Sequence, residues 1–117
     1  MSSEEVEVEI KKLAERNDKE RPMVDWNKNI LFVIDDLSKG YHAFFAEDGT
    51  ISEMKTYDDI KEEDIESAYI VLQGKCDSWL ALLRGEIKPT RAILMRKIKA
   101  KKGSIMELAP FTKVLGG

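Results

Sequence analysis

The chain is poor in the residues that supply most metal and redox chemistry. Its 117 residues include one cysteine, Cys76, and one histidine, His42. A lone cysteine excludes an internal disulfide and fits a reducing compartment. The sequence has neither a Cys/His cluster with metal-ligand spacing nor a glycine-rich phosphate loop. We therefore expect no metal, no cofactor and no catalysis, although Cys76 precedes an expected helix whose N-terminus could lower the pKa of the thiol.

Long apolar runs are also missing. No stretch approaches the roughly 20 apolar residues of a membrane-spanning helix. The acidic segment 1–12 has no apolar region like that of a signal peptide. Hydrophobic residues make up 43% of the chain and charged residues 35%, which is typical of a folded domain rather than a disordered one. We expect one cytoplasmic domain over residues 1–117, an ordinary domain length.

The net charge of −3 conceals a strong asymmetry along the chain. Residues 1–66 hold 9 Lys and Arg against 19 Asp and Glu, whereas residues 67–117 hold 10 against 3. The two parts could attract each other within one domain. Alternatively, the basic part could present a face to an anionic partner.

Residues 1–22 are predicted to form a helix and a connector. Val6, Ile10 and Leu13 recur at helical spacing and form one apolar stripe. Ser2 has the spacing of a capping box with the glutamate three residues later. We expect the polar run 17–22, which starts at Asn17, to end the helix because its proline cannot continue it.

Residues 30–57 are predicted to form three antiparallel strands. The strands are Ile30–Asp35, Tyr41–Glu47 and Thr50–Tyr57, each bounded by turn residues. Asp48-Gly49 predicts a two-residue hairpin turn, in which both central residues need a positive φ. The acidic connector 58–66 is expected to form one helical turn, with Ile60 and Ile65 directed inward.

Residues 67–117 are predicted to form a strand, two short helices, a basic strand and a last helix. The first strand is Ser67–Gln73, and helical patterns cover Trp79–Arg84 and Pro89–Arg96. Both helices are apolar on nearly every side, so each must be covered by more than the sheet. The extra cover could be protein, a partner or a lipid.

The basic strand Lys97–Lys102 leads into an apolar C-terminal segment. Ser104 and Glu107 have capping-box spacing, and Pro110 should kink the last helix or restart it. The predicted elements follow in the order helix, three strands, a fourth strand, two helices, a fifth strand and a last helix. This order predicts an α+β domain whose helices gather on one face of a five-stranded sheet.

The stretch from Ala68 to Gly103 resembles the sterol carrier protein 2 family of lipid-binding domains. A strand leads into an apolar helix, SWLALLRG, and the basic segment KIKAKKG resembles the family strand K-L-K-V-x-G. The family's link pattern G-x-L-x-P-x-x-A is matched here by Gly85, Ile87, Pro89 and Ala92. The earlier strands also fit, so the resemblance extends over nearly the whole domain from about Val6.

Three features depart from the family pattern. Arg96 stands where the family often has glycine, one extra residue precedes Gly103, and Pro110 interrupts a last helix that usually runs unbroken. The resemblance implies a twisted, mostly antiparallel five-stranded sheet with helices packed on one face. It also implies an apolar tunnel between the sheet and the C-terminal helices.

The resemblance and the surplus apolar surface together predict a non-catalytic lipid-binding or lipid-transfer protein. Its ligand would be a fatty acyl chain, an acyl-coenzyme A or a sterol-like molecule held in the tunnel. The expected lining residues are Trp79, Leu82, Leu83, Ile93, Leu94, Met106, Phe111 and Leu115. The same side chains could instead be ordinary core. The alternative function is therefore a protein interaction or homodimerisation module without a ligand cavity.

Five cations crowd into seven residues at the basic strand. They are Arg96, Lys97, Lys99, Lys101 and Lys102. They could contact lipid headgroups or a transient anionic membrane surface, or hold the phosphates of an acyl-coenzyme A. They could also be a solvated face that protects a sheet edge. No aromatic side chain lies among them, so we expect no nucleic-acid partner.

The terminal Gly116-Gly117 raises one further rival, a ubiquitin-like modifier or sulfur carrier. Such a fold needs an extended strand that leads into the diglycine. Here the segment Phe111–Leu115 has a helical pattern instead. We interpret the diglycine as a helix stop, since glycine is common after helices.

Overall fold

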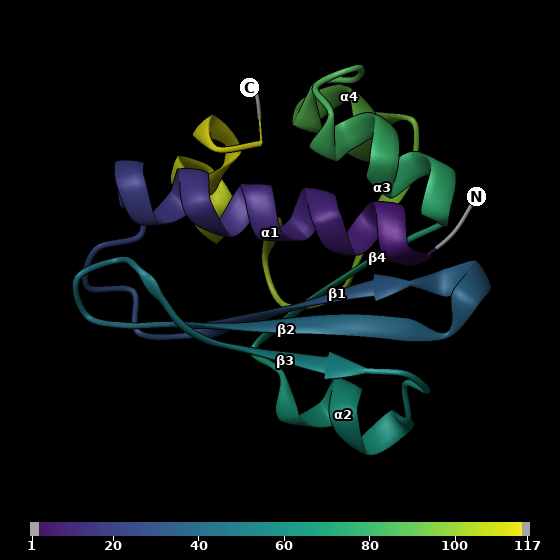
Figure 1. Ribbon diagram of the computed structural model, residues 1–117, viewed down its shortest axis with the longest axis horizontal. Helices are drawn as coiled ribbons and strands as arrows, with labels where there is room; N and C mark the ends of the chain where they lie inside the picture. The colour runs from purple at the N-terminus through teal and green to yellow at the C-terminus, as the bar shows by residue number, and fades with distance from the viewer. Residues whose placement is uncertain (1–2, 116–117) are drawn as a thin grey trace.

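The fold is a five-stranded sheet with most of its helices on one face (Figure 1). The computed structural model describes residues 3–115, so Ser2 and Gly116-Gly117 lie outside the described residues. In chain order the elements are α1 (Ser3–Glu20), β1 (Asn29–Ile34), η1 (Asp35–Leu37), β2 (Lys39–Phe45), β3 (Ile51–Tyr57), α2 (Glu62–Ser67), β4 (Ile70–Gly74), α3 (Cys76–Leu83), α4 (Pro89–Leu94), β5 (Ile98–Lys102), η2 (Ile105–Leu108) and η3 (Pro110–Lys113), where η marks a short 3₁₀-helix.

The strands are ordered β3-β2-β1-β4-β5 across the sheet. β1 runs parallel to β4, with Ile30 opposite Ile70, and the other three pairs are antiparallel. The predicted α+β domain with a mostly antiparallel five-stranded sheet is thus confirmed. β1 is the central strand and is covered on both faces, which explains its continuous apolar run.

The main core lies between the sheet and the helices α1, α3 and α4 (Figure 1). Phe32 of β1 meets Trp79 of α3 edge to face, with ring centroids 5.5 Å apart. The Trp79 indole Nε1–H donates a hydrogen bond of 2.8 Å to the backbone carbonyl of Val33. Because that polar group is satisfied, the whole indole can be buried without a desolvation penalty.

One helix lies on the opposite face of the sheet. α2 occupies the connector that was expected to form one helical turn, and Figure 1 shows it beneath the strands. Leu31, Val33 and Val71 form a second apolar cluster there, against which Ile60 and Ile65 pack. Because successive side chains of β1 point to opposite faces of the sheet, β1 contributes to both apolar clusters.

The first helix keeps its predicted apolar stripe and ends at Glu20, within the polar run 17–22 that was predicted to end it. Val6, Ile10 and Leu13 are buried, and Asn17 extends the stripe by one more turn instead of ending the helix. The Asn17 side-chain Nδ2 donates a 2.9 Å hydrogen bond to the carbonyl of Gly49. A buried polar residue can stay inside this helix because a distant loop supplies its acceptor.

The β2–β3 hairpin exists, but its predicted two-residue turn is wrong. The loop spans residues 46–50, and of the Asp48-Gly49 pair only Gly49 has a positive φ, at 87°. Asp18 at the end of α1 accepts the backbone N–H of Ile51 at 2.8 Å. The wider loop places its backbone against α1, a contact that local turn preferences could not predict.

The C-terminal segment restarts at Pro110. A restart was one of the two predicted outcomes, and a kink was the other. It forms η2 and η3 in place of a regular helix, because Pro110 lacks the N–H that would bond back to the preceding turn. The predicted capping box is wrong. Ser104 makes no side-chain cap, and the carboxylate of Glu107 binds Tyr69 instead.

Candidate functional site

An apolar pocket of about 180 Å³ lies between β4, β5 and the C-terminal helices. Leu72, Leu82 and Ile98 are buried at its base, while Ile93 and Ile105 are half-buried. The whole lining consists of Leu72, Leu82, Pro89, Thr90, Ile93, Ile98, Ile105, Leu108, Ala109, Thr112 and Leu115. With threonines as its only polar side chains, this pocket suits an apolar ligand.

Three of the predicted lining residues border this pocket, namely Leu82, Ile93 and Leu115. Sequence reasoning missed most of the others. The signal for Ile98 was its place among lysines on the basic strand, where one apolar residue must face the core. For Leu108, a buried wall residue, the signal was the apolar spacing of the C-terminal segment.

The remaining predicted lining residues lie elsewhere. Trp79, Leu83 and Phe111 are fully buried in the main core and do not border the pocket. Leu94 and Met106 have exposed fractions of 82% and 81%. Leu94 directly follows the pocket residue Ile93, and Met106 directly follows Ile105. Both side chains project into solvent.

A polar clamp holds η2 over the start of β4. The Glu107 carboxylate accepts hydrogen bonds from the Tyr69 hydroxyl at 2.9 and 3.1 Å. Lys28 Nζ lies 3.5 Å from the same carboxylate and 4.5 Å from the centre of the Tyr69 ring. The hydrogen bond from Tyr69, more than any other contact, holds the pKa of Glu107 below its ordinary value. One wall of the pocket is thereby tied to the sheet.

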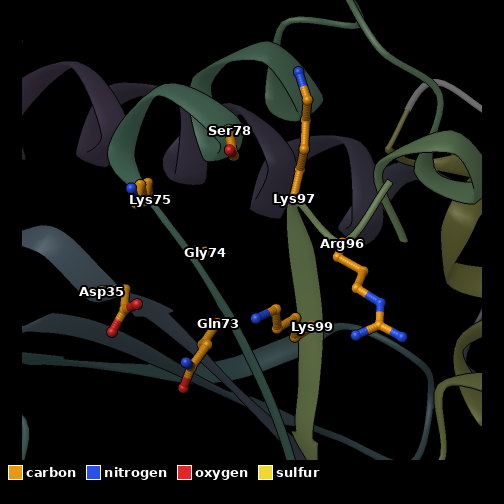
Figure 2. A pocket seen from close by; sticks show the side chains of 8 residues that line it. All are labelled: Asp35, Gln73, Gly74, Lys75, Ser78, Arg96, Lys97 and Lys99. Atoms are coloured by element: carbon orange, nitrogen blue, oxygen red, sulfur yellow. The ribbon is translucent and has the colours of Figure 1, made fainter. Parts of the chain in front are cut away.

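The basic residues lie at a different place from the apolar pocket. Arg96, Lys97 and Lys99 border a cleft of about 260 Å³ at the junction of β4 and α3 (Figure 2). Lys101 borders a smaller hollow between η1 and α2. Lys102 donates a hydrogen bond of 2.6 Å to the carbonyl of Glu66. The cations in and just before β5 therefore lie in three different surroundings.

The two residues weighed for catalysis are both buried. Cys76 lies in the apolar core; burial, and next the carboxylate of Asp36, raise the pKa of its thiol. The prediction of a lowered pKa is wrong, because desolvation of the thiolate outweighs the helix N-terminus. His42 packs beneath the sheet, hydrogen-bonded to Asn29 and Tyr57.

Within residues 3–115, no helix combines the length and the apolar character needed to cross a membrane.

Comparison of the sequence with protein-family models and with curated proteins gives no match. Solved structures, in contrast, share the fold. Sterol carrier protein 2 matches with a TM-score of 0.71 at 16% identity, over 93% of this chain and 94% of that chain. Palmitated SCP2L2 from Aedes aegypti matches with a TM-score of 0.56 at 14% identity, over 92% of this chain and 95% of that one.

The same fold also occurs inside a larger enzyme. The stereoselective inverting sec-alkylsulfatase Pisa1 from Pseudomonas sp. matches with a TM-score of 0.63 at 16% identity, over 90% of this chain but only 15% of the sulfatase. At these identities the comparisons establish architecture. The chain has the sterol carrier protein 2-like fold, as the sequence resemblance predicted.

Proposed function

We propose that this chain is a non-catalytic lipid carrier that holds part of an acyl chain in the apolar pocket. The observation that carries this proposal is the pocket itself, in which Leu72, Leu82 and Ile98 form an apolar base between the sheet and the C-terminal helices. The palmitated form of a fold neighbour supports it. We also infer a cytoplasmic setting, because Cys76 is a buried free thiol.

The size of the pocket limits what it can hold without rearrangement. Apolar cavities of about 150 Å³ stay dry and accept a benzene-sized molecule, and the present pocket measures about 180 Å³. It therefore accommodates a segment of one acyl chain rather than a whole lipid. A longer chain requires η2 and η3 to move away from β5.

The energetics suit a carrier that releases its ligand. Eight buried methylenes contribute roughly 6 kcal/mol at about 0.8 kcal/mol each. Association costs about 4–15 kcal/mol in lost freedom. We therefore expect weak binding of medium-length chains, with affinity that rises as longer chains bury more methylenes.

Displacement of a fluorescent fatty acid tests the proposal directly. The pocket variant Ile93→Asn/Ile105→Asn places two polar amides in the apolar lining and should weaken binding roughly tenfold or more. The matched control is Leu94→Asn/Met106→Asn, which makes the same chemical change at the next residue in each helix. Because those side chains are exposed, the control should bind the probe as the unaltered protein does.

Two results would contradict lipid binding in this pocket. One is the absence of any saturable uptake by the unaltered protein, also seen as a lipid-free mass in native mass spectrometry. The other is an equal loss of affinity in the pocket variant and its control. Circular dichroism of both variants would confirm that each remains folded.

A second candidate function rests on the exposed apolar side chains. Leu94, Met95 and Met106 are at least half exposed, and such a surface can bury a partner protein or a second copy of the chain. Sedimentation equilibrium distinguishes the candidates. A tight dimer that takes up no lipid favours an interaction module, whereas a monomer that takes up lipid favours the carrier.

A further inference from the structure

The cleft of about 260 Å³ is formed where β4 and β5 meet below the start of α3. Gly74 pairs with Ile98 and Gln73 with Lys99 in the antiparallel register. Lys75, the residue after β4, therefore leaves the sheet beside Lys97, the residue before β5. The complete lining is Asp35, Gln73, Gly74, Lys75, Ser78, Arg96, Lys97 and Lys99.

Gly74 allows the two strands to approach closely at the base of this cleft. A Cβ atom at this position would lie 2.5 Å from Ile98 Cδ1 and 2.8 Å from the carbonyl oxygen of Lys97. Both distances are shorter than any normal carbon contact, and the second involves backbone. The close packing of β4 against the start of β5 thus requires a residue without a side chain at this position.

The cleft carries a large excess of positive charge. Four of its side chains are cationic, from Lys75, Arg96, Lys97 and Lys99, and one is a carboxylate, from Asp35. Within the described part of the chain, none of these four cations lies within 4.0 Å of a carboxylate oxygen. With four cations and one carboxylate the lining has a formal charge of +3, so an anion of about three charges would complement it.

The four cationic side chains leave the lining of the cleft in different directions. Figure 2 shows Lys99 extending from β5 toward Gln73, with Lys75 at the start of α3 on the other side of β4. Lys97 extends toward the helices, and the Arg96 guanidinium lies beyond β5. All four are exposed, and none forms an ion pair with a residue in the range 3–115, so their long side chains can turn toward a bound anion.

Arg96 also stands in an unfavourable backbone conformation. Its φ is +57°, in the left-handed region that favours glycine. An arginine there costs stability that glycine would not. Strained residues gather at functional sites, where the strain accompanies a role of the side chain.

The cleft is separate from the apolar pocket, although both use β4 and β5. Leu72 and Ile98 border the pocket, whereas Gln73 and Lys99, the next residues in each strand, border the cleft. Successive strand residues point to opposite faces of a sheet. A ligand in the cleft therefore has its own residues, and none of them lines the pocket.

We propose that this cleft binds the phosphate groups of a small molecule that carries a diphosphate. Lys75, Lys97 and Lys99 hold the phosphate oxygens, and the hydroxyl of Ser78 supplies a neutral donor. Two linked phosphates match the net charge of the cleft better than one carboxylate does. The lining contains no aromatic ring on which a nucleobase could stack, so recognition rests on the phosphates.

Isothermal titration with inorganic pyrophosphate tests this site on the whole chain. The unaltered protein should bind with one-to-one stoichiometry. Lys75→Gln/Lys99→Gln should weaken binding by about tenfold or more, because charge-assisted hydrogen bonds to two cations are lost. The control Lys11→Gln/Lys113→Gln removes the same charge at two exposed lysines outside the cleft and should change affinity less than about twofold.

A second variant removes the cation of Arg96 and puts glycine in its place, a residue that suits the backbone there. Arg96→Gly places glycine at a positive φ, so the protein should remain folded while pyrophosphate binding weakens. Binding is measured with two probes, pyrophosphate and vesicles that contain phosphatidic acid. The comparison identifies the source of the bound phosphate. Binding of pyrophosphate indicates a soluble ligand, and binding of vesicles alone, abolished by the same variants, indicates a lipid headgroup.

Two outcomes would overturn the proposal. One is no saturable binding of either probe to the unaltered protein. The other is equal weakening in the cleft variant and in the Lys11/Lys113 control, which would reduce the effect to net charge. Fatty-acid displacement by the cleft variants should be unchanged, so failure here is distinct from failure of the proposed lipid binding.

Discussion

At the scale of single residues, several buried polar groups are held by partners that lie far away in the sequence. His42 is the clearest case. Its Nε2–H donates to Asn29 Oδ1 at 2.6 Å, an oxygen that also accepts the backbone N–H of Tyr69 at 2.9 Å. Its Nδ1 then accepts from the Tyr57 hydroxyl at 3.3 Å. This arrangement is the one that the neutral imidazole forms with Nε2 protonated.

The neutral state of His42 makes stability depend on pH. Burial, and next the charge of Lys55, lower its pKa below the ordinary value of 6.5. Near that pH the unfolded chain takes up a proton that the folded chain does not. The free energy of unfolding should therefore decrease as the pH falls from about 7.5 to about 5.5, a range above the titration of most carboxylates.

Urea unfolding at the two pH values measures this effect, with His42→Gln as the comparison. The variant should lose clearly less stability between them than the unaltered protein does. An equal loss in both proteins would assign the pH dependence to other groups. Sequence alone predicted that His42 lies on a strand, but its partners come from β1 and β3, and only the sheet register brings them together.

At the scale of elements, most helices and strands could be predicted because their apolar residues recur at the right period. The exceptions are segments shaped by contacts from elsewhere. α1 continues through Asn17 because Gly49 supplies an acceptor, and the β2–β3 loop widens because Asp18 binds its backbone. Glu107 leaves the predicted capping box because Tyr69 offers a donor. In each case a tertiary hydrogen bond replaces a local one.

The Tyr69 clamp should control how readily η2 moves. Tyr69→Phe keeps the ring, and with it the edge-to-face contact with Trp26 at 5.8 Å, but removes the hydroxyl that binds Glu107. Amides of η2 should then exchange with solvent deuterium severalfold faster. Tyr57→Phe is the matched control, since that hydroxyl binds His42 in a different part of the fold. Equal exchange in all three proteins would exclude the clamp as a restraint.

At the scale of the whole molecule, the lining of the candidate site was harder to predict than the fold. Local patterns indicate which residues are apolar, but only packing decides whether such a residue lies in the core, at a cavity or in solvent. Phe111 is fully buried, Leu115 borders the pocket and Met106 is exposed, although all three follow one apolar pattern. A resemblance between sequences does not carry this information.

Under the proposed carrier function, the exposed pair Leu94 and Met106 should govern lipid exchange rather than lipid affinity. Each follows a half-buried isoleucine of the pocket, so we expect both side chains to enter a bilayer during transfer. Burial of one such side chain contributes about 1.5–3 kcal/mol, so Leu94→Asn/Met106→Asn should slow fatty-acid transfer from vesicles roughly tenfold or more.

Stopped-flow transfer from anionic vesicles measures that rate. The control Val8→Asn/Val24→Asn alters two apolar residues of similar exposure, 51% and 54%, away from the pocket. It should leave the rate nearly unchanged. Slowing by both variants to the same extent would show that the pocket rim has no special part in exchange.

The parallel pairing of β1 with β4 has a consequence for how the protein is made. Ile34 and Ile70 belong to paired strands but are joined by the whole β2–β3 hairpin and α2. Closing so long a loop is slow compared with forming a hairpin, because its entropy is lost before any contact compensates for it. A ribosome-bound chain can complete the hairpin first, whereas the pocket and the cleft both await β4 and β5. A ligand of the pocket or of the cleft would thus bind the fully folded protein and not a folding intermediate.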